Sequence, residues 1–161
     1  ATIRRQRQMC IRDRPRTSTE PLSEDDVFPM GDGEVIPVHL PGHTSDGMGF
    51  HIPHLSTLVV GALLPRADRP TRWDMPGGSL VDIVASLKRI KRMDLASIVP
   101  LQGPAIRGKA HVEEVLDRHL SFFEEAVVNE GQPPSSWDRP ATTAVWLTPR
   151  SPWPLEEKES V

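Results

Sequence analysis

The sequence predicts a layered α/β fold in which β-strands are followed by a helix, one further strand and a second helix. Short apolar segments separated by turn residues lie between residues 34 and 61. Two later segments, 79–93 and 109–129, have apolar residues at helical spacing, and Ser97–Val99 between them suits a buried strand. This order places both helices on one face of a sheet and leaves the other face without a covering element.

The expected strands are short and interrupted by turns. Residues 34–40 (EVIPVHL) form the first, and Pro37 within it indicates an edge position or a bulge. Residues 48–52 and 56–61 form two more strands around the turn at Pro53-His54.

The first helix has a clear beginning and end. Ser79 is expected to cap it, with Asp82 at capping-box spacing. The helix should end near Met93, directly after a cluster of cationic residues in its last turns. Its apolar face comprises Leu80, Ile83, Val84, Leu87 and Ile90. The second helix is expected over residues 109–129, with Gly131 at the position of a C-cap.

Composition divides the chain into three parts. Residues 1–33 are expected to be tail and linker, because residues 15–33 are rich in Pro, Ser, Thr, Asp and Glu. Residues 34–131 are the expected folded domain. Residues 132–161 contain many prolines and read as an extended tail, with one short strand possible at Ala144–Leu147.

The arginine-rich start of the chain has three interpretations. Residues 1–16 hold six arginines and one acidic residue, as in a basic arm for nucleic acid or lipid, or in a solvated terminus. The segment Met9–Arg14 also resembles the conceptual translation of a transposon-end adapter used in DNA sequencing libraries. We therefore expect residues 1 to about 14 not to be natural protein.

Charge and cysteine content exclude several classes of function. Residues 17–161 carry 13 basic and 21 acidic side chains, a net charge of −8, so no nucleic-acid partner is expected. The single Cys10 excludes an internal disulfide and a cysteine-rich zinc module. No segment is long and apolar enough to cross a membrane, and no apolar secretion signal is present, so the expected location is the cytoplasm.

Three ordered motifs resemble the second half of metallo-β-lactamase-fold hydrolases. Residues 39–44 (HLPGHT) resemble the PGHT signature, residues 59–64 (VVGALL) the strand-ending GD segment, and residues 98–104 (IVPLQGP) the PGHGP segment. The match runs from about Glu34 to about Asn129 and implies part of an αββα sandwich, with the first half missing. The stretches ASLKRI and GPAIRGK resemble most the branch that contains beta-lactamase-like protein 2.

The resemblance implies a metal site that this chain has lost. In active relatives two metal ions, usually zinc, hold a hydroxide that attacks the substrate. His43 matches the PGHT ligand, whereas Ala62 replaces the bridging aspartate and Gln102 the last histidine, and neither is a good zinc donor. The HxHxDH motif, which supplies most ligands in relatives, does not occur in the sequence. We therefore expect no bound zinc and no catalytic or cofactor-binding residues.

The function implied by the resemblance is hydrolysis. In relatives, zinc-activated water attacks an ester, thioester, lactam or phosphodiester of a small-molecule substrate. With His43 as the only matching metal ligand, this chain is expected to be an inactive fragment of such a hydrolase. The alternative is a non-catalytic degenerate domain that serves packing or partner binding.

The missing half predicts a partner surface. Half a sandwich would leave an inner apolar sheet face without cover, which we assign to Val35, Val38, Leu58 and Val60. Exposed apolar surface of this kind promotes association, so we expect marginal stability or self-association through that face.

Other motifs have more ordinary explanations. Residues 103–110 (GPAIRGKA) approach a phosphate-binding P-loop, but Ala110 lacks the magnesium-binding hydroxyl and Pro104 removes a backbone N–H. Asp46 is either a partner of His43 or a turn residue. The remaining histidines are expected at the surface, in local hydrogen bonds or in packing: His39, His51, His54, His111 and His119.

Overall fold

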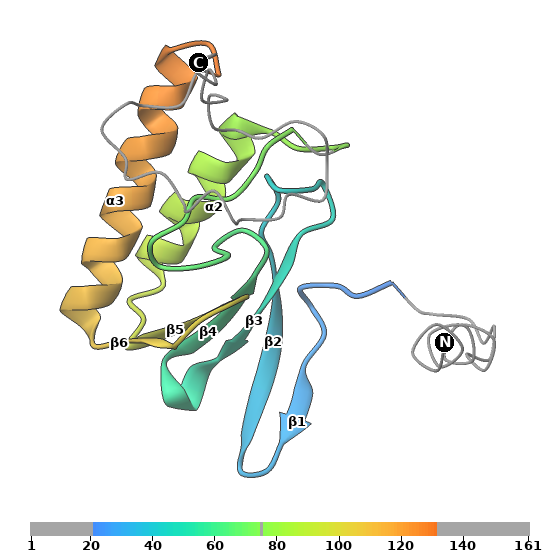
Figure 1. The fold of residues 1–161 in the computed structure, drawn as a ribbon. Helices are drawn as coiled ribbons and strands as arrows, with labels where there is room; N and C mark the ends of the chain where they lie inside the picture. Colours follow the sequence, from blue (N-terminus) through green and yellow to red (C-terminus); the bar gives the residue numbers. More distant parts are fainter. Residues whose placement is uncertain (1–20, 75, 132–161) are drawn as a thin grey trace, which may run out of the picture.

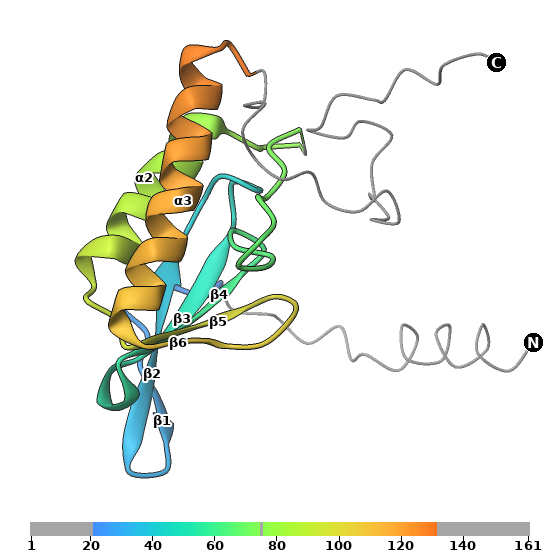
Figure 2. The same ribbon diagram turned by 60° about the vertical axis from the view of Figure 1, so that its left-hand side comes forward.

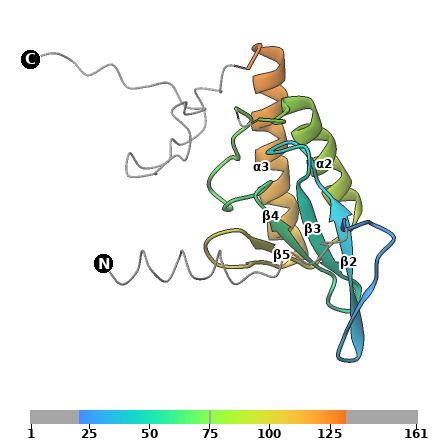
Figure 3. The same ribbon diagram turned by 90° about the vertical axis from the view of Figure 1, so that its right-hand side faces the viewer.

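The computed structural model describes residues 21–74 and 76–131. In this part, one sheet with the strand order β1-β2-β3-β4-β5-β6 carries two α-helices on one of its faces (Figures 1 and 3). The predicted α/β class is therefore confirmed. In chain order the elements are β1 (Phe28–Met30), β2 (Gly33–His39), β3 (Met48–Ile52), the 3₁₀ turn η1 (Pro53–Leu55), β4 (Thr57–Gly61), α2 (Leu80–Arg92), β5 (Ser97–Pro100), β6 (Ile106–Arg107) and α3 (Lys109–Val128).

The strand directions determine which loops meet. β2 and β4 both pair with β3 antiparallel, so they run in the same direction, and β5 pairs with β4 in parallel through the crossover helix α2. The C-terminal ends of β2, β4 and β5 consequently lie at one edge of the sheet. This edge is the place where the loops that follow the three strands converge.

Two short strands were not predicted. Residues 28–30, assigned to a linker, form β1 and pair with Gly33–Val35. Residues 106–107, assigned to a loop, form β6 and pair with β5. All of β1 is exposed, so burial imposes no alternation of apolar and polar residues that a sequence pattern could reveal. β6 has only two residues, which is too short for any periodicity.

The edge position predicted for Pro37 is confirmed. β1 pairs with residues 33–35 of β2 only, so at Pro37 the strand has a sheet neighbour on one side alone, where it faces Phe50 of β3. A residue without an N–H fits there because no ladder hydrogen bond is required on the open side.

Both helices begin as the sequence predicts. The Ser79 side chain accepts a hydrogen bond from the backbone N–H of Asp82 at 3.2 Å and caps α2. The two helices lie side by side (Figures 1 and 2) and are joined by an ion pair between Lys88 and Glu124 at 2.7 Å. The C-cap of α3 is Asn129, not Gly131 as predicted. Gly131 lies two residues further on, has a φ of 89° and donates its N–H to the carbonyl of Ala126 at 2.8 Å. No helix among the described residues has the length and apolar character needed to cross a membrane.

The core lies between the sheet and the helices, which corrects the assignment of the sheet faces. Val38, Leu58 and Val60 were assigned to an uncovered face, yet they are buried in the core, with exposed fractions of 5%, 0% and 1%. The face that they form, with Ile98, is the helix face of the sheet.

The opposite side, called the outer face here, follows from the strand pairing. Phe50, Val59 and Val99 pair across β3, β4 and β5, and Pro37 with Val35 continues the same side on β2. No helix of the described segments lies over this face (Figure 3). An apolar face opposite the helices therefore exists as expected, but of the four residues named for it only Val35 belongs to it. Sequence alternation separates the two faces without showing which of them the helices cover.

Candidate functional site

The three positions singled out by the sequence lie at the same edge of the sheet. His43 is in the loop that follows β2, Ala62 directly follows Gly61 at the end of β4, and Gln102 follows Pro100 at the end of β5. Gly61 and Pro100 are paired neighbours. The backbone N–H of Gln102 donates to the carbonyl of Pro65 at 2.8 Å and ties the loops after β4 and β5 together. These three residues are called the edge site below.

The loop that carries His43 is held against the start of α2. The Ser79 N–H donates to the carbonyl of Gly42 at 2.9 Å, and the Ser86 hydroxyl donates to the carbonyl of Pro41 at 2.7 Å. Gly42 has a φ of 136°, and a Cβ there would lie 2.6 Å from the backbone nitrogen of Ile83. Only glycine allows this close approach, so Pro41-Gly42 fixes the position of His43 through backbone geometry.

The imidazole of His43 is oriented through Nδ1. This nitrogen lies 3.0 Å from the backbone carbonyl oxygen of Arg72 and 3.1 Å from Oγ1 of Thr71. The Thr71 hydroxyl also donates to the carbonyl of Ala62 at 2.7 Å. Thr71 therefore links two members of the edge site, His43 and Ala62.

The segment that contains Thr71 and Arg72 is anchored to α3. Trp73 packs edge-on against Phe123 with ring centroids 6.0 Å apart. Nε2 of His119, a fully buried residue of α3, lies 3.3 Å from the carbonyl oxygen of Arg69. These contacts hold the backbone that positions His43 from the helix layer.

The donor atoms of the edge site do not fit a centre of two metal ions. His43 offers one imidazole nitrogen, Ala62 has a methyl side chain, and Gln102 is exposed and offers a neutral amide oxygen. Among the described residues, no group of three or more His, Cys, Asp or Glu side chains could hold a metal ion. No reaction step through zinc can be derived from these residues.

Two residues near His43 have local roles. Nε2 of His39 lies 2.9 Å from the carbonyl oxygen of Ser45, so His39 holds the β2–β3 loop, in agreement with the local hydrogen bond expected for it. The hydroxyl of Thr44 beside Asp46 lowers the pKa of this exposed carboxyl, as does the Asp46 backbone N–H. Asp46 is accordingly a turn residue, the second of its two interpretations.

The P-loop-like segment adopts a different structure. Residues 103–105 lie in the loop between β5 and β6, and residues 106 and 107 form β6, which pairs with β5. The Lys109 ammonium is paired with the Asp94 carboxylate at 2.5 Å. That this segment binds no nucleotide remains a prediction.

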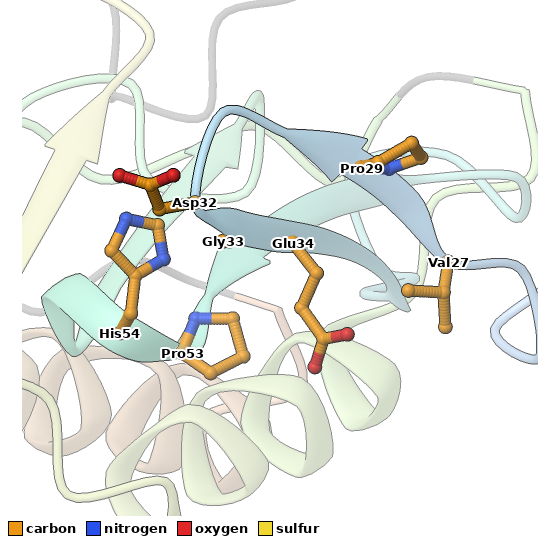
Figure 4. A pocket seen from close by; sticks show the side chains of 7 residues that line it. All are labelled: Val27, Pro29, Asp32, Gly33, Glu34, Pro53 and His54. Carbon is orange, nitrogen blue, oxygen red and sulfur yellow. The ribbon is translucent and has the colours of Figure 1, made fainter.

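A shallow hollow of about 430 Å³ lies at the other end of β2 (Figure 4). It is lined by Val27, Pro29, Asp32, Gly33, Glu34, Pro53 and His54. Because Gly33 begins β2 and the edge site follows its last residue, this hollow is separate from the edge site.

Thr71 and Arg72 are the residues of this site that sequence reasoning missed. They lie in a proline- and arginine-rich loop without a motif, 28 and 29 positions after His43. Their role depends on tertiary contacts, so no local sequence signal could have identified them.

Sequence comparison gives a limited result. No model of a known protein family matches the sequence. An uncharacterized protein of Aquifex aeolicus (strain VF5) is 39% identical over 69 residues, which are 43% of this chain and 32% of that protein. The chain thus spans about a third of the length of this relative.

Structural comparison identifies the fold. ETHE1 from Myxococcus xanthus matches with a TM-score of 0.55 and 18% identity, over 80% of this chain and 65% of that chain. A metallo-β-lactamase from Pontibacter korlensis matches with a TM-score of 0.54 and 18% identity, over 73% and 54%. The B3 metallo-β-lactamase BLEG-1 gives a TM-score of 0.50 and 19% identity, over 58% and 44%. The chain therefore has the metallo-β-lactamase fold over part of the length of these proteins, and at these identities the likeness shows the fold alone.

Proposed function

We propose that this chain is a metallo-β-lactamase-fold segment that does not carry out zinc-dependent hydrolysis by itself. Its three motifs resemble those of metallo-β-lactamase-fold hydrolases, so we infer that it descends from such an enzyme. Its present residues supply one metal donor, His43, where a centre of two metals needs several. The assignment to the branch of beta-lactamase-like protein 2 remains a prediction, as does the cytoplasmic location.

One observation carries this proposal: the three residues of the edge site follow strands that end at one edge of the sheet, and only His43 among them offers a strong metal donor. Ala62 follows β4, Gln102 follows the parallel strand β5, and the Thr71 hydroxyl joins Ala62 to the ring of His43. The three loops follow strands that end at one edge of the sheet, so we attribute the lack of further donors to the residues at positions 62 and 102.

Restoring the donors tests the proposal. The double variant Ala62→Asp with Gln102→His would add a carboxylate and an imidazole beside His43. We expect purified wild-type chain to hold no stoichiometric zinc, and the double variant to bind zinc at least about tenfold more tightly, since even outer partners of metal ligands change affinity about 10–100-fold. Isothermal titration with zinc chloride and elemental analysis measure both quantities.

A matched control separates donor chemistry from changes in shape. Ala62→Asn with Gln102→Asn introduces neutral amides at both positions and should leave zinc binding at the wild-type level. Adding His43→Ala to the restored variant should remove the gain. Equal zinc affinity in all variants would show that these positions do not face a common centre. A wild-type chain that holds zinc and hydrolyses a generic ester would overturn the proposal.

The outer face supports a second candidate function, association with another copy of this chain. The paired residues Phe50, Val59 and Val99 are apolar, and Phe50 is 36% exposed. Contiguous apolar surface of this kind lowers its free energy by packing against a similar surface. A second copy offers the same sheet face, so two outer faces can pack together as the sheets of a sandwich do.

A charge on the outer face tests this association. We expect Phe50→Asp to shift sedimentation-velocity profiles towards the monomer, because a carboxylate would have to be desolvated between two apolar sheets. Val128→Asp is the matched control, since Val128 is 79% exposed at the end of α3, away from the sheet. A wild-type chain that is monomeric at all concentrations, or equal effects of the two variants, would contradict this candidate.

A further inference from the structure

The hydrogen bonds around His43 determine which ring nitrogen carries the proton. The Arg72 carbonyl oxygen, 3.0 Å from Nδ1, can only accept a hydrogen bond. The Thr71 hydroxyl has one hydrogen, which it donates to the carbonyl of Ala62 at 2.7 Å, so towards Nδ1 at 3.1 Å it also has to accept. Both oxygens therefore require a proton on Nδ1.

The arrangement leaves Nε2 as the nitrogen with the lone pair. A neutral imidazole has one N–H, so a proton held on Nδ1 makes Nε2 the acceptor. Among the described residues, Nε2 of His43 has no hydrogen-bond partner. At this edge of the sheet, Nε2 is therefore the atom through which His43 can accept a hydrogen bond, a proton or a cation.

We propose that Thr71 is the positioning residue of the edge site: its hydroxyl, bonded to the end of β4, holds His43 in the tautomer with the proton on Nδ1 and the lone pair on Nε2. Thr71 does not itself reach a ligand. It acts through His43, in the way that outer partners orient histidine ligands in metalloproteins.

The burial of Thr71 makes this role specific. The residue is 2% exposed, so water does not readily replace its hydroxyl. Its neighbours are held by the ring contact between Trp73 and Phe123 and by the contact of His119 with the Arg69 carbonyl. A buried hydroxyl that joins two loops has little freedom to leave either partner, and the imidazole is oriented before any ligand arrives.

This inference depends on the proposed function only in regarding His43 as the remaining donor of the edge site. The tautomer is a property of the metal-free chain and can be measured without zinc. If the variant with Ala62→Asp and Gln102→His failed to bind zinc, the tautomer assignment would still stand. If His43 carried its proton on Nε2, the proposal that the chain does not hydrolyse substrates with zinc would still stand.

Nitrogen NMR of the imidazole tests the proposal. Long-range proton–nitrogen correlation spectra of the ¹⁵N-labelled full chain distinguish the two neutral tautomers, at about pH 8, where an unperturbed imidazole is neutral. We expect wild-type His43 to carry its proton mainly on Nδ1. Thr71→Val keeps the shape and removes the hydroxyl, and should lower the ratio of the two tautomers by about two- to tenfold, the range that one hydrogen bond supplies. Arg72 still accepts from Nδ1, so the shift should be partial.

Two variants control for structural damage. Thr71→Ser restores the hydroxyl and should return the wild-type ratio, which a merely space-filling role of Thr71 would not predict. Thr57→Val removes a hydroxyl that contacts Ser97 at 2.6 Å, in another part of the sheet, and should leave His43 unchanged. If Thr71→Val does not fold, Thr71→Ala, which also lacks the hydroxyl, takes its place with the same expected lower ratio. A wild-type ring protonated mainly on Nε2, or a ratio unchanged in folded Thr71→Val, would overturn the proposal.

Discussion

The two faces of the sheet have similar composition and different surroundings. On the helix face, Leu58, Val60 and Ile98 are at most 1% exposed and pack in the core with α2 and α3. On the outer face, Val59 and Val99 are only partly buried, and Phe50 is exposed. Both faces are lined by large apolar residues, so residue type does not separate them.

This difference shows that a layered fold can continue its apolar surface beyond its own core. In the described part of the chain, α2 and α3 cover the helix face and bury its apolar side chains. The outer face has an equivalent apolar surface that no described helix covers (Figure 3). We infer that the outer face is suited to packing against a second layer, whereas the helix face is already covered by α2 and α3.

The strongest test of this comparison uses two neighbouring valines of β4. Val60 is 1% exposed on the helix face, and Val59 lies on the outer face. We expect Val60→Ala to lower the free energy of unfolding by about 2–3 kcal/mol, since it removes buried methyl groups and leaves a cavity. Val59→Ala should cost less than about 1 kcal/mol. Urea unfolding of dilute samples measures both, and equal losses would show that the outer face is covered.

The pH dependence of the unfolding free energy tests the helix side of the molecule, because His119 of α3 is buried there. Burial lowers the pKa of His119 below its ordinary value of 6.5, opposed by its contacts with the carbonyls of Val115 and Arg69, while the charge of Arg118 adds to the lowering. Because the unfolded state then binds a proton that the folded state does not, stability is present above pH 6.5 and is lost as the pH falls below it. The slope for one proton is at most about 1.4 kcal/mol per pH unit.

A substitution isolates this contribution. His119→Gln should flatten the dependence of unfolding free energy on pH between about 7 and 5. Ser121→Gln, at an exposed position of the same helix, removes no titratable group, so it serves as the control and should leave the slope as in the wild type. Identical slopes in the two variants would mean that His119 does not titrate as its burial implies.

The smallest expected change in the free energy of unfolding comes from Glu24, at the open edge of β2. The Glu24 carboxylate accepts a hydrogen bond from the backbone N–H of His39 at 2.5 Å and pairs with Arg89 at 2.7 Å. The bond to His39 is the main cause that lowers the pKa of Glu24 below 4.5, so its stabilisation is present above that pH and is lost as the pH falls through the folded-state pKa.

Replacement of this carboxylate should have a modest result. Glu24→Gln is expected to cost no more than about 1 kcal/mol at neutral pH, because both partners are more than a third exposed. The difference from the wild type should shrink as the pH falls below 4.5 and through the folded-state pKa, because the carboxyl becomes protonated there. Glu125→Gln on α3 is the control, and a difference that persists in acid would point to packing instead of charge.

Much of the fold followed from local patterns. Met48–Ile52 and the start of α3 at Lys109 agree with their predicted bounds, and Ser79 caps α2 as its spacing with Asp82 indicates. These features depend on residues within a few positions of one another. β1 and β6 were missed because they are short and are stabilised by pairing with their neighbours.

The edge site was predictable only in part. The order of the motifs placed His43, Ala62 and Gln102 after three strands, and the parallel arrangement of β2, β4 and β5 brings those strand ends to one edge. The carbonyl of Arg72 and the hydroxyl of Thr71 reach His43 from a distant loop without a motif. Nothing in their local sequence marks them as its partners.

The sequence by itself determined the order of β2 to β5 and of the two helices, and the absence of strong metal donors in the side chains of residues 62 and 102, because periodicity, capping and side-chain chemistry are local properties. The tertiary structure decided which face of the sheet the helices cover and which nitrogen of His43 holds the proton. Both depend on contacts between segments far apart in the chain, such as the 28 positions that separate Thr71 from His43.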